Sequence, residues 1–268
     1  MQHSQLNNTS SEVQEYRRLQ LRLLDELKKI CDRHNLTYWL NFGTLLGALR
    51  YKSYIPWDDD IDVSMMMPDY KKFLEIAEKE LPKDIFLQTP KTDPAYKQAF
   101  AKLRDCNSTF LEHTETGNEK YHTGIYIDIF PFIEYPIMPK ILHKALLHFS
   151  VPSRDLAVIR GKNKIKNYTI YGICKFVWIL FSPFKSGKFG RTHEDNGYYE
   201  LIPYESIIPV KQIEFEGKMY SAPNDPAASM SSMYGPDFMT PPPPEKRIPH
   251  AKTILPHTPC NHPRAVKK

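Results

Sequence analysis

The stretch YWLNFGTLLGALRYKSYIPWDDDIDVSM, residues 38–65, carries most of the information about this chain. A turn of small residues, Gly43-Thr44, follows an apolar run, and a group of four carboxylates comes after it. These carboxylates are Asp58, Asp59, Asp60 and Asp62. Asp60 and Asp62 alternate with apolar neighbours, so on a β-strand they would share one face.

Two carboxylates placed side by side repel each other and raise each other's pKa unless a positive group lies between them. Mg²⁺ is typically bound by one or two carboxylates together with substrate phosphates. The pair Asp60 and Asp62 therefore predicts a metal site for a phosphorylated ligand.

Three other interpretations of the acidic run compete with a metal site. A run of charges is usually a solvated loop, but apolar residues on both sides would bury this one. The spacing of Asp58, Asp60 and Asp62 is that of an EF-hand loop, but Val63 stands where such a loop needs glycine. The Asp-Asp-x-x-Asp pattern of prenyl-diphosphate enzymes requires a long helix, which Pro56 disfavours.

A second segment, GIYIDIFPF at 124–132, places Asp128 alone among apolar residues. A carboxylate in an apolar strand is costly unless it is paired or binds a metal. A neighbouring lysine is the alternative partner. Together with the pair Asp60 and Asp62, the pattern favours Asp128 as a third metal ligand.

Composition indicates a soluble globular protein, with 268 residues, 41% of them apolar and 25% charged. The net charge of +5 is mild, and we expect no nucleic-acid partner. The four cysteines show no paired spacing, as in proteins of a reducing compartment. Residues 1–15 have no apolar core like that of a signal peptide, so we expect a cytoplasmic protein.

Local patterns predict helices and strands in alternation. A capping box at Ser11 and Gln14 begins an amphipathic helix over 11–34, with Asn35 as a left-handed C-cap. Strands are expected at 38–42, 60–65, 99–103 and 124–129, and helices at 45–50, 69–81 and within 139–182. This order indicates an α/β or α+β fold. The polar, proline-containing tail at 251–268 is expected to be disordered.

Five segments together resemble the LicD family, to which fukutin and fukutin-related protein also belong. They are YWLNFGTLLGALR, IPWDDDID, AKLRDCNSTFLE, GIYIDIFPF and MYGPDFMTPPPPEKRIPH, and they spread in the family's order over 38–250. The resemblance implies a nucleotidyltransferase fold related to DNA polymerase beta, with a mixed sheet flanked by helices. Residues 1–250 would form one domain, with a core at 36–135 and a helical, loop-rich C-terminal elaboration at 136–250.

The same resemblance implies roles for individual residues. Asp60, Asp62 and Asp128 would bind Mg²⁺, or Mn²⁺ in its place, and act in catalysis together with Asp58, a further ligand or general base. Gly43 and Thr44 would bind a phosphate at the start of a helix. The other substrate-binding candidates are Arg50, Lys102, Arg247 and His250. For Lys102 and Arg247 the alternative is a structural ion pair, and for His250 a loop histidine.

Family members are implied to use a CDP-activated alcohol, such as CDP-choline or CDP-ribitol, and to release CMP. We therefore expect transfer of phosphocholine to a glycan or lipid-linked glycan of the cell surface, such as lipopolysaccharide, teichoic acid or capsule. One alternative is a metal-dependent glycosyltransferase that uses a nucleotide sugar. Another is a non-catalytic glycan- or metal-binding scaffold.

Residues 154–191 contain nine Lys or Arg and one acid, a pattern that attracts phosphates or the acidic face of a membrane. The apolar run at 168–184 lies within this segment. We predict a helix buried in the core, with a membrane-surface helix as the alternative. A peripheral contact through 154–191 would place the protein on the inner face of the membrane. The sequence HTPCNH at 257–262 is a weak zinc signal.

Overall fold

The structure, a computed structural model, describes residues 11–158, 164–192 and 201–265. Its helices are α1 (Ser11–His34), α2 (Phe42–Tyr51), α3 (Met67–Glu80), α4 (Lys140–Val158), α5 (Lys164–Phe181), α6 (Tyr204–Ile207), α7 (Pro226–Tyr234) and the 3₁₀ turn η1 (Pro244–Lys246). Its strands are β1 (Tyr38–Leu40), β2 (Asp62–Met66), β3 (Ile85–Gln88), β4 (Ala101–Asp105), β5 (Thr109–Glu112), β6 (Tyr126–Pro136), β7 (Lys185–Arg191), β8 (Ile202–Pro203), β9 (Lys211–Phe215), β10 (Lys218–Ala222) and β11 (Ala251–Leu255).

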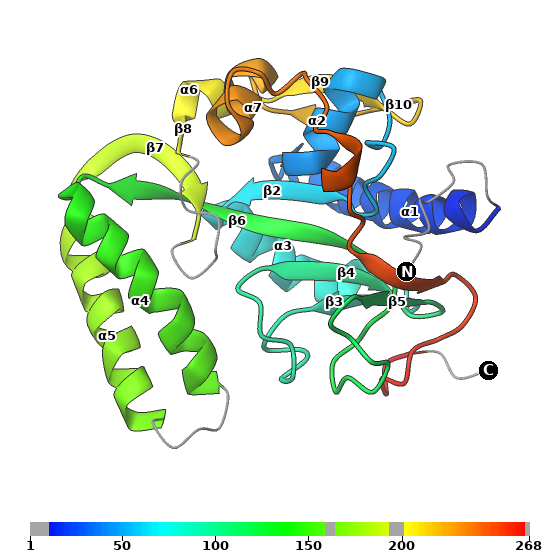
Figure 1. Cartoon of the computed structure of the whole chain (residues 1–268), viewed down its shortest axis with the longest axis horizontal. Coiled ribbons are helices and arrows are strands. Elements are labelled where there is room, and N and C mark those ends of the chain that lie inside the picture. The colour runs from blue at the N-terminus through cyan, green and yellow to red at the C-terminus, as the bar shows by residue number, and fades with distance from the viewer. Residues whose placement is uncertain (1–10, 159–163, 193–200, 266–268) are drawn as a thin grey trace.

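A mixed sheet forms the centre of the molecule, with strands in the order β1, β2, β6, β4, β3 (Figure 1). β2 and β6 are parallel, whereas β1 and β4 run antiparallel to their neighbours β2 and β6. β7 pairs with the C-terminal half of β6, and β8 pairs with β7. The predicted α/β class, a mixed sheet flanked by helices, is confirmed.

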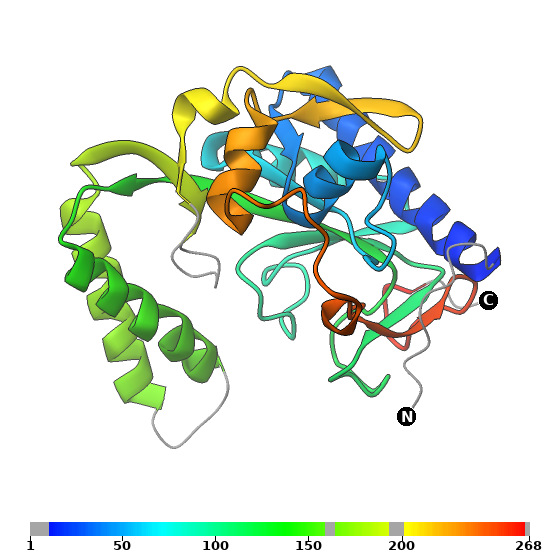
Figure 2. The same ribbon diagram turned by 45° about the horizontal axis from the view of Figure 1, so that its top comes forward.

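Helices α1 and α3 contact each other, and both contact β6, so they cover one face of the sheet (Figures 1 and 2). α1 contributes a continuous apolar stripe to the core, including the fully buried Leu23, Leu24 and Leu27. The helix has the predicted bounds, and Asn35 ends it with φ at 51°. Val63 of β2 and Ile127 of β6 pack in the same core.

The prediction of a disordered tail at 251–268 is wrong for the residues that the structure describes. Residues 251–255 form β11, which pairs antiparallel with β5, and Cys260 is buried further on. β5 has no other paired strand among the described residues, so β11 satisfies backbone groups that would otherwise form an open edge. Ile254 of β11 packs against the apolar cluster that contains Phe110 of β5, so side chains as well as backbone join the two strands.

The prediction of a core helix at 168–184 is also wrong. α5 packs chiefly against α4, and this α4–α5 hairpin stands away from the sheet at the ends of β6 and β7 (Figures 1 and 2). At its base the Tyr135 ring contacts Trp178 of α5 and His143 of α4, with ring centroids 5.0 and 5.3 Å away. No helix within 11–158, 164–192 and 201–265 combines the length and apolarity needed to cross a bilayer.

Candidate functional site

The acidic run lies where the loop after α2 enters β2. Two hydrogen bonds hold the backbone of Asp62 against the start of α2. Asn41 N–H donates to the carbonyl of Asp62, and Asp62 N–H donates to Thr44 Oγ1 at 2.7 Å. The sequence predicts a strand that begins at Asp60, but β2 begins at Asp62, so Asp60 lies in the preceding loop and does not share a strand face with Asp62. The start of α2 and the start of β2 are thereby held together.

The register of three strands brings two predicted acids and one predicted cation into a row. Asp62 of β2 lies opposite Asp128 of β6, and Asp128 lies opposite Lys102 of β4. Lys102 Nζ is 2.7 Å from Asp128 Oδ1, and both side chains are almost completely buried. In this state Asp128 is therefore paired with a lysine, the alternative partner that its sequence context indicated.

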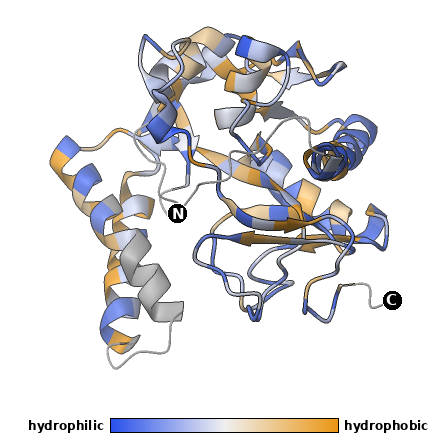
Figure 3. Cartoon of the chain, turned by 45° about the vertical axis from the view of Figure 1, so that its right-hand side comes forward, coloured by the Kyte–Doolittle hydropathy of each residue, from blue (hydrophilic) through white to orange (hydrophobic). Residues whose placement is uncertain are grey.

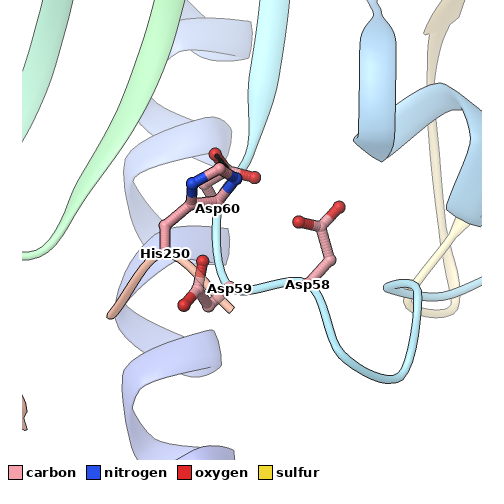
Figure 4. Close-up of side chains that lie close together, drawn as sticks. All are labelled: Asp58, Asp59, Asp60 and His250. Carbon is pink, nitrogen blue, oxygen red and sulfur yellow. Dashed lines mark ion pairs between the residues drawn. The ribbon is translucent and has the colours of Figure 1, made fainter. Parts of the chain in front are cut away.

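The C-terminal segment supplies a further group to the site. His250 Nε2 lies 4.0 Å from Asp60 Oδ2, and the next backbone N–H, that of Ala251, donates to Asp59 Oδ2 at 2.6 Å. Figure 4 shows His250 over Asp60, with Asp58 and Asp59 on the same loop. The ligand atoms of these four side chains all lie within 4.8 Å of one another.

We call Asp58, Asp59, Asp60, Asp62 and Asp128 the acidic centre. Burial raises the pKa of all five carboxyls, and that of Asp58 and Asp62 rises well above the usual range because Asp60 adds repulsion. The Lys102 ammonium limits the rise at Asp128, whose pKa is about 6. At Asp60 the rise in pKa is opposed mainly by the nearby His250. Lys102 and His250 thus offset only part of the repulsion among these carboxyls.

These residues fit a divalent cation. Carboxylate oxygens are the donors that Mg²⁺ and Mn²⁺ prefer, and a cation would offset both the burial and the mutual repulsion that raise the pKa of these carboxyls. Asp58, Asp59, Asp60 and His250 have the closest spacing among the described residues. Asp62 and Asp128, two of the three ligands that the resemblance implied, lie beside this group on β2 and β6. The structure thus shows a place for a metal without identifying the ion.

Two cavities meet at the acidic centre. The first, of about 450 Å³, is lined by Asp58, Asp60, Asp62, the start of α2 and the segment 234–250. The second, of about 760 Å³, is lined by Asp60, Asp128, Lys102 and aromatic residues of the segment 96–126. Asp60 and His250 line both cavities, so the two spaces share one point.

Several predicted substrate-binding residues line these cavities. Gly43 and Arg50 line the first, Lys102 the second, and His250 both. Gly43 has a steric reason to be glycine, because a Cβ at this position would collide with the Asp58 carboxylate.

Two predicted residues have other contacts. The Thr44 hydroxyl is buried and accepts the Asp62 N–H, so it positions β2 instead of facing a phosphate. Arg247 stacks over the Trp57 ring at 4.5 Å and donates to the Pro242 carbonyl, and it lines neither cavity. Its neighbour Lys246 lines the first cavity in its place.

Two positioning residues, Asp59 and Gln20, have no role in the predictions from sequence. Asp59 is fully buried and binds the C-terminal segment through Ala251. Gln20, a buried polar residue on α1, donates from Nε2 to the carbonyls of Asp59 and Tyr126. It ties the acidic loop to the start of β6. From the sequence, a glutamine on an amphipathic helix is expected on the surface, because its partners on the acidic loop and β6 are distant along the chain.

The weak zinc signal in the tail finds no support among the described residues. His257 lies 3.9 Å from Glu15, whereas His262 lies 3.9 Å from Asp93 and contacts the rings of Phe86 and His122. The two histidines therefore face different partners, and neither belongs to the group of closely spaced ligand atoms.

The fold and the site define a class: a mixed α/β protein with a buried acidic centre between two cavities. Comparison with known proteins shows what this chain is similar to. Residues 35–157 match the model described as LicD/FKTN/FKRP, nucleotidyltransferase domain. The chain is 28% identical to the lipopolysaccharide cholinephosphotransferase LicD of Haemophilus influenzae, over 86% of this chain and 92% of that protein. The chain is therefore similar to LicD-family proteins, through the family model over 35–157 and through the cholinephosphotransferase over most of its length.

Two other relatives match over shorter stretches. The ribitol-5-phosphate transferase FKTN of Macaca fascicularis is 27% identical over 129 residues, which cover 48% of this chain and 24% of FKTN. An uncharacterised protein of Rickettsia prowazekii is 30% identical over 121 residues, or 44% of this chain and 43% of that protein.

Proposed function

We propose that this protein is a metal-dependent phosphotransferase. It moves a phospho-alcohol, with phosphocholine as the favoured cargo, from a CDP-activated donor to a sugar of a cell-surface glycan and releases CMP. The observation that carries the proposal is the pair of cavities that share Asp60 and His250, because Asp62 lines one of them and Asp128 the other. Phosphoryl transfer needs the attacking and leaving oxygens to lie roughly in line, so two substrates must reach one point from different sides.

The comparisons favour phosphocholine over ribitol phosphate as the cargo. Similarity to the cholinephosphotransferase extends over 92% of that protein, whereas similarity to FKTN extends over 24% of its length. Phosphotransferase names for both relatives also favour this reaction over the alternatives, a glycosyltransferase that uses a nucleotide sugar or a non-catalytic scaffold.

We assign the donor to the first cavity. Arg50 and Lys246 would neutralise phosphate charge there, and Phe42 and Gly43 at the start of α2 line the same space, where backbone N–H groups would bind a phosphate. Mg²⁺, bound by Asp60 with other members of the acidic centre, would neutralise charge on the diphosphate and on the leaving CMP. Asp58 lines this cavity too and would be a further ligand.

We assign the acceptor to the second cavity. Asp128 lines it, and a carboxyl with a pKa of about 6 suits a group that takes a proton from a hydroxyl near neutral pH. Lys102 keeps this carboxylate oriented and lies 3.4 Å from the centre of the Tyr126 ring. Aromatic and carboxylate side chains such as Tyr121 and Glu115 suit a sugar, which offers an apolar face and many hydroxyls.

The proposed reaction requires no nucleic acid. We place the protein in the cytoplasm, at the inner face of the membrane.

A donor screen tests the proposal. The purified protein is incubated with Mg²⁺, a glycan acceptor and CDP-choline, CDP-ribitol or a UDP- or GDP-sugar, and release of the nucleotide is measured. We expect CMP from CDP-choline, its loss on chelation with EDTA and its loss in Asp60→Asn. Glu78→Gln, on the exposed side of α3, is the matched control for removing one acid. Turnover of a nucleotide sugar alone would overturn the proposal in favour of a glycosyltransferase.

A further inference from the structure

The α4–α5 hairpin exposes large apolar side chains over its length. Ile165 and Phe176 of α5 are 85% and 66% exposed, and Ile141 of α4 is 81% exposed. The others that are more than half exposed here are Ile137, Phe149, Ile173, Ile179, Leu180 and Phe184. Figure 3 shows apolar and hydrophilic residues alternating along the hairpin. Contiguous exposed apolar surface of this kind marks an interaction site in a soluble protein.

The same segment concentrates the positive charge of the chain. Residues 137–191 contain eleven Lys or Arg and one acid, whereas the rest of the sequence contains 25 Lys or Arg and 30 acids. The hairpin segment is therefore strongly positive and the remainder is negative. Lys166 and Lys175 of α5 are exposed among the apolar side chains, and Lys185 and Lys188 of β7 are exposed at the base. Arg154, Arg160, Lys162 and Lys164 also belong to this count, but their side chains lie outside the described residues.

We propose that the α4–α5 hairpin docks on the surface of an anionic lipid bilayer. Apolar side chains interspersed with Lys and Arg, here with a single acid in the segment, are what an interfacial helix presents to anionic headgroups and the outer part of the acyl chains. A second copy of this chain is a poorer occupant, because two hairpins in contact would bring two strongly positive segments together.

The position of the hairpin connects this surface to the acidic centre. β6 runs from Asp128 at the site to Pro136 at the base of the hairpin, eight residues that span roughly 26 Å in a strand. Docking would therefore fix the site at a set height above the bilayer, within reach of a glycan that projects from a lipid. This last step rests on the proposed function, whereas the docking itself does not.

Vesicle binding tests the proposal. The full-length protein is sedimented with phosphatidylcholine vesicles that contain or lack phosphatidylglycerol, without donor or acceptor, so the result is independent of the transfer reaction. We expect binding to the anionic vesicles alone and its loss as salt rises, since exposed charges are screened. The variant Lys166→Glu/Lys175→Glu/Lys188→Glu should lower the partition coefficient by at least roughly a hundredfold. The matched control reverses Lys71, Lys72 and Lys79, which are exposed on α3.

A second variant tests the apolar contribution. Phe176→Ser/Ile179→Ser/Leu180→Ser removes three exposed side chains, so the thermal melting curve should stay close to that of the wild type while vesicle binding falls. Met219→Ser removes a comparably exposed apolar side chain on β10 and should leave binding unchanged.

Three outcomes would overturn the proposal. Equal, salt-insensitive binding to neutral and anionic vesicles would show that charge does not direct the contact. A monomer that binds neither kind of vesicle would show that the hairpin does not dock on lipid. A dimer in sedimentation velocity that the serine variant converts to monomers, without vesicle binding, would assign the surface to a second copy.

Discussion

At the scale of single residues, the acidic centre depends on compensation from its neighbours. Asp128 keeps its charge beside Lys102, and Asp59 accepts a backbone N–H, but Asp58 and Asp62 remain close to other acids. Because the remaining repulsion is shared, a cation that enters the centre would act on several carboxyls at once. The acids should therefore contribute to activity as one unit.

Single substitutions test this unit. Asp60→Asn, Asp62→Asn and Asp128→Asn should each lower kcat/KM for CMP release by at least about a hundredfold, because the first two would remove metal ligands and the third the group that we assign to take the acceptor proton. Combining two of them should add little. Near-normal turnover in Asp128→Asn would make that acid purely structural.

The pair Asp128 and Lys102 requires its own control. Asp128→Asn leaves Lys102 buried without its carboxylate, which should lower the free energy of unfolding by about 3–5 kcal/mol. Lys102→Met/Asp128→Asn should regain most of that stability in urea denaturation but none of the activity. If the double variant regained activity as well, the low activity of Asp128→Asn would be explained by loss of folded protein.

A glycine tests the link between α2 and the acidic run. In Gly43→Ala the new methyl group would collide with Asp58 Oδ2 and displace the carboxylate. We expect turnover to fall on the order of a hundredfold, because small displacements at a reacting centre have effects of this size. Gly172→Ala in α5 meets nothing within 4 Å, so it should leave turnover intact and stabilise its helix slightly. Equal turnover of the two variants would refute the steric explanation.

At the scale of elements, the C-terminal segment completes the site. Truncation after His250 removes β11, its pairing with β5 and the Ala251 bond to Asp59. We expect the free energy of unfolding to fall by at least about 2 kcal/mol, since a hydrogen bond to a charged group contributes about 1.5–3 kcal/mol before packing is counted. Lys252→Ala, at an exposed position of the same strand, should change stability by less than about 0.5 kcal/mol. A truncated protein as stable as the wild type would mean that β11 contributes nothing in solution.

Local patterns predicted those elements whose signal lies within one segment. α1 follows from its apolar period and cap, and β2 and β6 from carboxylates alternating with apolar residues. β5 and β11 pair across more than a hundred residues, and short strands take their stability from such neighbours instead of from their own residues. The pairing of Lys102 with Asp128 depends likewise on the register of β4 and β6, which tertiary contacts set.

At the scale of the whole molecule, stability depends on groups far from the acidic centre. His122 is completely buried, and its Nδ1 accepts the N–H of Gly124 at 3.0 Å, so the neutral ring carries its proton on Nε2. Burial, with added repulsion from Arg104 and His262, lowers the pKa of His122 to about 2. His262 lies in the C-terminal segment, and its ring centroid is 5.2 Å from that of His122.

This histidine should make folding sensitive to acid. In the unfolded chain His122 takes up a proton near its ordinary pKa of about 6.5, whereas the folded protein excludes that proton until far lower pH. The unfolded state then binds more protons, so stability is full above about pH 6.5 and decreases as pH falls. Between pH 7 and pH 5 the loss from this residue should be about 2 kcal/mol. His122→Asn offers an acceptor to Gly124 and does not titrate, so urea denaturation at both pH values should show the wild type losing about 2 kcal/mol more than the variant. Contributions from His262 and the acidic centre are common to both proteins and cancel in this difference. If the wild type and the variant lost the same free energy of unfolding between the two pH values, His122 would become protonated in the folded protein as readily as in the unfolded chain.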